Sequence, residues 1–91
     1  MKAQMHNFSG WVTETNPAAL DKLFTEKLTK AGFNILSKTE KHFEPFGYTS
    51  LYLLSESHFA IHTFPEHGET YIELSSCVKG PLNAFIKDMA L

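Results

Sequence analysis

The 91-residue sequence contains no arginine, and its eight basic residues are lysines spread along the chain. Because the planar guanidinium group is the usual bidentate partner of carboxylates and phosphates, this absence argues against phosphorylated ligands. The formal net charge is −2, which gives no electrostatic reason to expect nucleic-acid binding. We therefore expect no nucleic-acid partner.

Cysteine and long hydrophobic runs are also scarce. The single cysteine, Cys77, excludes a disulfide within the chain and favours a reducing compartment. No apolar run approaches the roughly 20 residues that span a bilayer, and the first residues lack the apolar core of a signal peptide. We therefore expect no membrane association and predict a cytoplasmic protein.

The length and composition indicate one small domain spanning residues 1–91. Hydrophobic residues make up 43% and charged residues 20% of the chain, as in ordinary globular proteins. A domain of this length buries only about 60–65% of its unfolded surface. Its stability is therefore expected to depend in part on a partner subunit.

The hydrophobic pattern predicts the element order β-α-β-β-β-β-α. Asn16 and Pro17 are typical of the N-cap and first position of a helix, and Gly32 is typical of its end. A second, short helix opens at Gly80-Pro81. The predicted strands cover residues 7–14, 33–43, 48–54, 58–64 and 70–77. This order favours an α+β two-layer sandwich, with both helices packed on one face of an antiparallel sheet. The opposite face needs a cover, and a second copy of the sheet would give a sheet-to-sheet dimer.

The residues that carry chemistry gather between positions 55 and 66, and the only thiol follows at position 77. The segments Ser55-Glu56-Ser57-His58, Ile61-His62-Thr63 and Pro65-Glu66 stand in this order. Together with Cys77 they resemble the self-cleavage and active-site segment of the bacterial and archaeal S-adenosylmethionine decarboxylases. The resemblance covers roughly residues 41–77. It implies a self-processing carboxy-lyase that makes the aminopropyl donor for spermidine and other polyamines.

The resemblance implies cleavage between Glu56 and Ser57. In this chemistry the Ser57 hydroxyl attacks the preceding carbonyl and turns the amide into an ester. Elimination then releases the upstream chain and leaves a pyruvoyl group at position 57. His62 matches the family's processing proton carrier, a role that suits an imidazole near neutral pH. Thr49 occupies the position of a processing serine. The pyruvoyl group is the expected cofactor, an electron sink for decarboxylation.

Three further residues match the family's catalytic and substrate-binding positions. Cys77 corresponds to the acid that reprotonates the α-carbon. Glu66 corresponds to a carboxylate that hydrogen-bonds the ribose hydroxyls, and Phe43 to an aromatic ring that stacks on adenine and also favours a sulfonium cation. The resemblance therefore implies S-adenosylmethionine as substrate, in an active site near the interface of a homodimer.

Several positions depart from the family's pattern. Thr49 replaces a serine, Phe64 replaces the usual tryptophan, and Val78 replaces the usual glycine. The chain also ends soon after the second helix, where relatives are expected to continue into another strand. Two alternatives therefore stay open. One is a pyruvoyl decarboxylase of another amino acid, such as ornithine or arginine, and the other is a homologue that does not process and acts as a regulatory or binding partner.

The spacing of Ser57 and His62 raises a geometric question. Residues five apart on a flat strand point to opposite faces, so we expect Ser57 to lie in a turn or bulge. A hydrolase triad of Ser57, His62 and Glu66 is a weaker interpretation, because no nucleophile elbow surrounds the serine.

A metal site is also not expected. His58, His62, His67 and Cys77 lack the paired-ligand spacing of structural zinc sites. Taken singly, these residues have ordinary structural roles, and it is their combined spacing with Ser57 that favours the decarboxylase interpretation.

Overall fold

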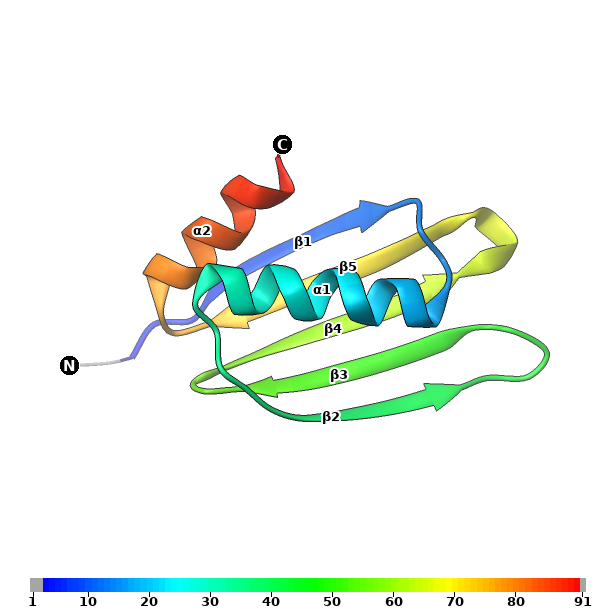
Figure 1. Cartoon of the computed structure of the whole chain (residues 1–91), viewed down its shortest axis with the longest axis horizontal. Helices are drawn as coiled ribbons and strands as arrows, with labels where there is room; N and C mark the ends of the chain where they lie inside the picture. Colours follow the sequence, from blue (N-terminus) through cyan, green and yellow to red (C-terminus); the bar gives the residue numbers. More distant parts are fainter. Residues whose placement is uncertain (1–2, 91) are drawn as a thin grey trace.

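The computed structural model describes residues 3–90, which form an antiparallel sheet with two helices on one face (Figure 1). The elements are β1 (His6–Val12), α1 (Pro17–Ala31), β2 (Ile35–His42), β3 (Tyr48–Leu54), β4 (Ser57–Phe64), the short 3₁₀ turn η1 (Pro65–His67), β5 (Glu69–Ser76) and α2 (Lys79–Met89). Their spatial order in the sheet is β1-β5-β4-β3-β2. The predicted element order and the α+β two-layer architecture are confirmed.

The ends of α1 follow from the residue types at its boundaries. The Asn16 side chain accepts a hydrogen bond from the Ala19 amide at 2.9 Å, and Pro17 occupies the first turn. Gly32 ends the helix with φ +106°, a left-handed conformation that glycine adopts without the steric cost of a Cβ. Both caps agree with the sequence prediction.

The core lies between the helices and one face of the sheet, which we call the helix face. Its fully or nearly fully buried side chains are Leu20, Phe24 and Leu28 from α1, Leu82 and Phe85 from α2, and Tyr52, Leu54, Phe59, Ile61, Ile72 and Leu74 from the strands. The strand members alternate with residues that point away, as the two-residue period requires. Burial of each large side chain contributes about 1.5–3 kcal/mol, so this single cluster is the main stabilising feature of the fold.

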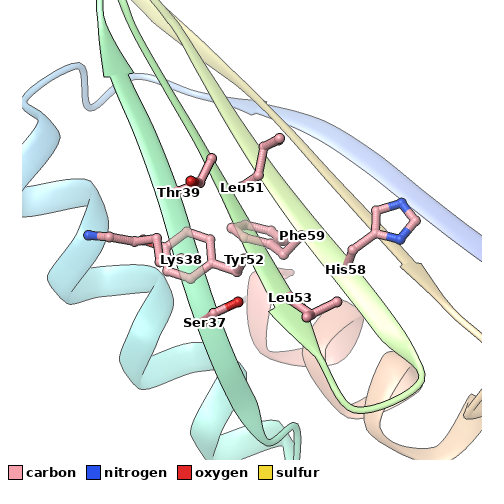
Figure 2. A pocket seen from close by; sticks show the side chains of 8 residues that line it. All are labelled: Ser37, Lys38, Thr39, Leu51, Tyr52, Leu53, His58 and Phe59. Carbon is pink, nitrogen blue, oxygen red and sulfur yellow. The ribbon is translucent and has the colours of Figure 1, made fainter.

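The opposite face of the sheet, which we call the open face, carries large exposed side chains. Trp11 is 57% exposed, Leu53 54% and Leu51 47%. A shallow depression of about 400 Å³ lies on this side (Figure 2), lined by Ser37, Lys38, Thr39, Leu51, Tyr52, Leu53, His58 and Phe59. Large apolar side chains exposed on one face of a sheet are found at interaction sites. The sheet-to-sheet dimer stays a prediction.

A polar cluster fastens α1 to the edge of the sheet. The Tyr52 hydroxyl donates to Asp21 Oδ1 at 2.5 Å, and Lys38 Nζ lies 3.0 Å from the same oxygen. Lys38 extends toward α1 in Figure 2. The Tyr52 hydrogen bond, aided by the Lys38 ammonium, holds the pKa of the Asp21 carboxyl below its usual range. Burial, with the bond to Asp21, raises the pKa of Tyr52.

Within residues 3–90, no helix is long and apolar enough to cross a membrane.

Candidate active site

The bend between β3 and β4 falls one residue before the predicted position. Ser55 and Glu56 form the turn, and Ser57 is the first paired residue of β4, opposite Leu54 and Ser76. The expectation that Ser57 itself lies in a turn or bulge is therefore wrong. Glu56 has φ +59°, the only non-glycine residue described in residues 3–90 with positive φ. A left-handed conformation costs a residue with a Cβ roughly 1–2 kcal/mol, so the turn concentrates strain directly before Ser57.

The peptide between Glu56 and Ser57 is held by the segment that follows β5. The Cys77 amide donates to the Glu56 carbonyl oxygen at 3.2 Å, and the Cys77 thiol donates to the same oxygen at 3.1 Å. The Ser57 hydroxyl donates to Ser76 Oγ at 2.7 Å, and both serines are buried. We call Glu56, Ser57, Ser76, Cys77 and Val78 the Ser57 corner. Its contacts hold both the carbonyl and the hydroxyl of the same junction.

The turn is also anchored from the side of α1. Asn34 Nδ2 donates to Ser55 Oγ at 3.3 Å, and the Ser55 amide donates to the Asn34 carbonyl at 3.1 Å. Glu56 is thus held on both sides: the preceding residue, Ser55, is hydrogen-bonded to Asn34, and the Glu56 carbonyl is hydrogen-bonded to Cys77. This double anchoring keeps the left-handed residue in position.

A second group of predicted residues lies around a pocket of about 300 Å³, which we call the His62 pocket. It is lined by Phe43, Phe46, Gly47, Tyr48, Thr49, His62, Thr63, Phe64 and Glu66. Four of these, Phe43, Thr49, His62 and Glu66, are candidates from the sequence. The structure therefore brings together a histidine, a carboxylate and aromatic rings from the β2–β3 loop, β3, β4 and η1. An apolar pocket with a few polar groups is the usual form of a small-molecule site.

His62 is fixed by contacts on both sides within the sheet. Its Nδ1 lies 3.1 Å from Thr49 Oγ1 on β3, and its ring stacks on Tyr71 of β5 with 6.2 Å between centroids. Tyr71 in turn packs against Trp11, with 5.3 Å between ring centroids. The strand register aligns these four residues in one row across the open face. Thr49, which replaces the family's serine, thus places a hydroxyl within hydrogen-bond distance of His62.

The structure does not bring Ser57 and His62 together. They are separated by about 17 Å of extended strand, at roughly 3.3 Å per residue, and their side chains point to opposite faces. In Figure 1 the β3–β4 turn lies at the same end of the sheet as the start of α2. The β2–β3 loop and the β4–β5 connection lie at the other end. The predicted catalytic residues therefore form two groups at opposite ends of β4.

Two residues of these groups were missed by sequence reasoning. Ser76 directly precedes Cys77 and shares the alternation of Ile72 and Leu74, which puts its hydroxyl on the buried face. A buried hydroxyl needs a hydrogen-bond partner, and this requirement was a usable signal. Phe46 lines the His62 pocket, but between Pro45 and Gly47 it was indistinguishable from an ordinary turn residue.

Metal ligation finds no support in the geometry. Within residues 3–90, no group of three or more histidine, cysteine, aspartate or glutamate side chains is arranged to hold an ion. His58 and His62 share a face, but about 13 Å of strand separates them.

Comparison with protein families matches residues 5–89 to the S-adenosylmethionine decarboxylase family. S-adenosylmethionine decarboxylase proenzyme 2 of Bacillus cereus is 45% identical over 47 residues, which are 52% of this chain and 38% of that protein. The proenzyme of Prochlorococcus marinus (strain MIT 9313) is 40% identical over 60 residues, 66% of this chain and 48% of the relative. The chain therefore spans about half or less of the length of these curated relatives.

The fold also matches a solved structure. The crystal structure of the adenosylmethionine decarboxylase from Aquifex aeolicus superposes with a TM-score of 0.68. The match covers 91% of this chain and 77% of the other, at 21% sequence identity. At that identity the likeness concerns the fold, which the two chains share over nearly all of the present sequence.

Proposed function

The chain belongs to the S-adenosylmethionine decarboxylase family, and from this premise we propose that it is a self-processing, pyruvoyl-dependent decarboxylase of S-adenosylmethionine. Its product would be the aminopropyl donor for spermidine and polyamine synthesis. The relatives named above are proenzymes of that activity. The observation that carries the proposal is the hydrogen bonding of the Glu56–Ser57 peptide by Cys77 and Ser76.

The carbonyl of Glu56 is set up to accept a nucleophile. When the Ser57 hydroxyl adds to the carbonyl carbon, negative charge develops on the carbonyl oxygen. That oxygen already accepts hydrogen bonds from the Cys77 amide and thiol at 3.2 and 3.1 Å. Donors aimed at an oxygen that gains charge lower the barrier more than they stabilise the ground state. Cys77 would therefore assist cleavage before it serves as the catalytic acid.

The residues present fit a pyruvoyl group at position 57. Ser57 follows Glu56, which has a strained left-handed backbone. The Glu56 carbonyl accepts a hydrogen bond from Cys77, and the Ser57 hydroxyl is hydrogen-bonded to Ser76. This group would supply the electron sink for loss of carbon dioxide. Cys77, which lies beside position 57, is the nearby thiol that would return a proton to the α-carbon of the substrate.

The His62 pocket would bind the nucleoside part of the substrate. Phe43 and Phe46 are half-exposed rings at its edge, and a ring of this kind stacks on a base or favours a sulfonium cation. The Glu66 carboxylate would accept hydrogen bonds from the ribose hydroxyls. His62, held by Thr49, would carry protons during cleavage. These roles agree with the chemistry of the pocket's side chains.

The two groups at opposite ends of β4 support a shared active site in a homodimer. Proton transfer needs atoms within about 2.6–3.2 Å, whereas about 17 Å of strand separates Ser57 from His62 in one chain. A two-fold dimer formed through the open faces, with the sheets antiparallel, would bring the His62 pocket of one chain to the end of the partner's β4 at which the Glu56–Ser57 peptide lies, on the face opposite the Ser57 hydroxyl. The exposed Trp11, Leu51 and Leu53 give this face the apolar character that such an interface needs.

The test is the intact mass of the purified chain under denaturing conditions, with Ser57→Ala as the control. Cleavage would yield two fragments, the second starting at position 57 and about 17 Da lighter than a serine-terminated peptide, because ammonia is lost when the cofactor forms. The cleaved protein should then release carbon dioxide from S-adenosylmethionine. A full-length mass after prolonged incubation would contradict the proposal and favour a homologue that does not process. Cleavage without turnover of S-adenosylmethionine would favour another amino-acid substrate.

A further inference from the structure

We propose that Ser76 positions the Ser57 hydroxyl for self-cleavage, an inference that rests on the proposed function. Ser76 Oγ lies 2.7 Å from Ser57 Oγ, and the two side chains are 0% and 6% exposed. They face each other at the end of the β4–β5 ladder, on the helix face. The next pairs on that face are apolar, Phe59 with Leu74 and Ile61 with Ile72.

The hydrogen-bond network determines the direction of the bond between the two serines. Ser76 Oγ donates to the Val78 carbonyl at 3.0 Å, and this uses the only hydrogen of its hydroxyl. The same oxygen accepts from the Val78 amide at 2.9 Å. Its remaining acceptor position receives the hydrogen of Ser57. Ser57 is therefore the donor, and its own lone pairs stay available.

This direction has a consequence for the nucleophile. A serine side chain has three staggered χ1 positions, and the bond to Ser76 favours one of them. The same hydrogen bond points the hydroxyl hydrogen of Ser57 toward Ser76. A lone pair of Ser57 Oγ is then free to attack the Glu56 carbonyl carbon. The first step of self-cleavage is an acyl shift, in which the Oγ–C bond forms, the C–N bond breaks, and the proton from Oγ ends on the nitrogen of residue 57. The amide becomes an ester and a free amine with no atom lost, and Ser76 orients the donor of that proton. The chain is cut in the elimination that follows.

The first comparison uses Ser76→Ala, Ser76→Thr and a matched control, Ser75→Ala. Ser75 is a neighbouring buried serine on the opposite side of β5, where its hydroxyl donates to Asn7 Oδ1 at 2.6 Å. Each full chain is made in a cell-free translation reaction, and cleavage is followed by intact mass. Thermal melting of each variant in the uncleavable Ser57→Ala background confirms the fold.

We expect Ser76→Ala to slow cleavage about three- to tenfold, from the lost rotamer preference and the lost hydrogen bond. Ser76→Thr, which keeps the hydroxyl, and Ser75→Ala should cleave at the wild-type rate. Wild-type cleavage in a folded Ser76→Ala chain would overturn the role of Ser76 and leave the proposed function standing. A folded Ser76→Thr chain that cleaves as slowly as the alanine variant would also overturn it. An uncleaved wild-type chain would overturn both proposals.

The second comparison separates positioning from a structural role through Val78. Ser76→Ala is repeated in a Ser57→Cys background, where the nucleophile is a thiol and a weak hydrogen-bond donor. If Ser76 acts through the hydroxyl of residue 57, its substitution should change the cleavage rate of this background by less than about twofold. Equal slowing in the serine and cysteine backgrounds would mean that Ser76 acts by holding the Val78 amide, and this would overturn the inference.

Discussion

The separation of Ser57 from His62 along β4 predicts that two defective chains complement each other. In a two-fold dimer each active site would combine Ser57 of one chain with the partner's His62. A Ser57→Ala chain lacks the nucleophile but supplies an intact histidine. A His62→Ala chain keeps the nucleophile but supplies no histidine. Only the mixed dimer contains one complete site, and in that dimer the His62→Ala chain is the one that would be cleaved.

The expected yield follows from the geometry and from random pairing. With about 17 Å of strand between the residues and side chains on opposite faces, neither variant should complete a site within its own chain. When the two are co-produced in equal amounts, about half of the His62→Ala chains enter a mixed dimer. We therefore expect about half of those chains to be cleaved, while every Ser57→Ala chain stays at full length.

The assay is the intact mass of the co-produced chains, with a small tag to tell the two variants apart. The matched control co-produces His62→Ala with the double variant Ser57→Ala/His62→Ala, which forms the same dimers but contains no intact histidine. That mixture should remain uncleaved. Normal cleavage of His62→Ala alone, or no cleavage in mixed dimers that demonstrably form, would refute the reasoning from the two separated groups.

Three further predictions concern single positions. Cys77→Ala keeps its backbone amide on the Glu56 carbonyl, so cleavage should slow by no more than about tenfold. Decarboxylation should fall by about 10²-fold or more because the catalytic acid is lost. Unchanged turnover and an unchanged product would show that Cys77 is not the catalytic acid. In the uncleavable Ser57→Ala background, Glu56→Gly should melt about 4 °C or more above Glu56→Ala, because only glycine is free of the left-handed strain of roughly 1 kcal/mol; equal melting temperatures would show that the turn is unstrained. Asp21 has a depressed pKa in the folded chain, so its stabilising contribution is present above the ordinary pKa of 3.8 and disappears as the pH falls through the depressed pKa. In urea titrations the difference in unfolding free energy between wild type and Asp21→Asn should therefore be larger at neutral pH than in strong acid. A difference that does not change with pH would contradict a depressed pKa of Asp21.

The fold was largely predictable because its signals are local. The caps at Asn16 and Gly32, and the alternation of Leu51 and Leu53 with Tyr52 and Leu54, each depend on neighbours within a few residues. The structure confirms the caps and both faces of β3. The bounds of β3 are as predicted, the other strands differ from the prediction by at most two residues at either end, and β5 ends at Ser76 rather than at Cys77. The shift at Cys77 bears on the site, because Cys77 follows the last residue of β5 and contacts the Glu56 carbonyl.

The arrangement of the candidate site residues could be predicted from the sequence only in part. The motif singled out Ser57, His62, Glu66 and Cys77, and the structure gathers them in two groups. Odd spacing already indicated opposite faces for Ser57 and His62. The conclusion drawn from it, that Ser57 lies in a turn or bulge, was wrong because Ser55 and Glu56 form the turn and Ser57 is already paired in β4. The motif did not reveal that Ser57 and His62 lie far apart within one chain.

The sequence by itself determined the element order, the two faces of the sheet and the membership of the family, because each depends on residue identity and short-range spacing. Only the tertiary structure decided which distant residues meet. The pairing of Ser57 with Ser76, and the contact of Cys77 with the Glu56 carbonyl, join positions about twenty residues apart through the register of β4 and β5. Register is selected by the burial of a whole sheet face against the helices. That choice is a property of the packed core as a whole, and it determines which hydroxyl faces the serine at position 57.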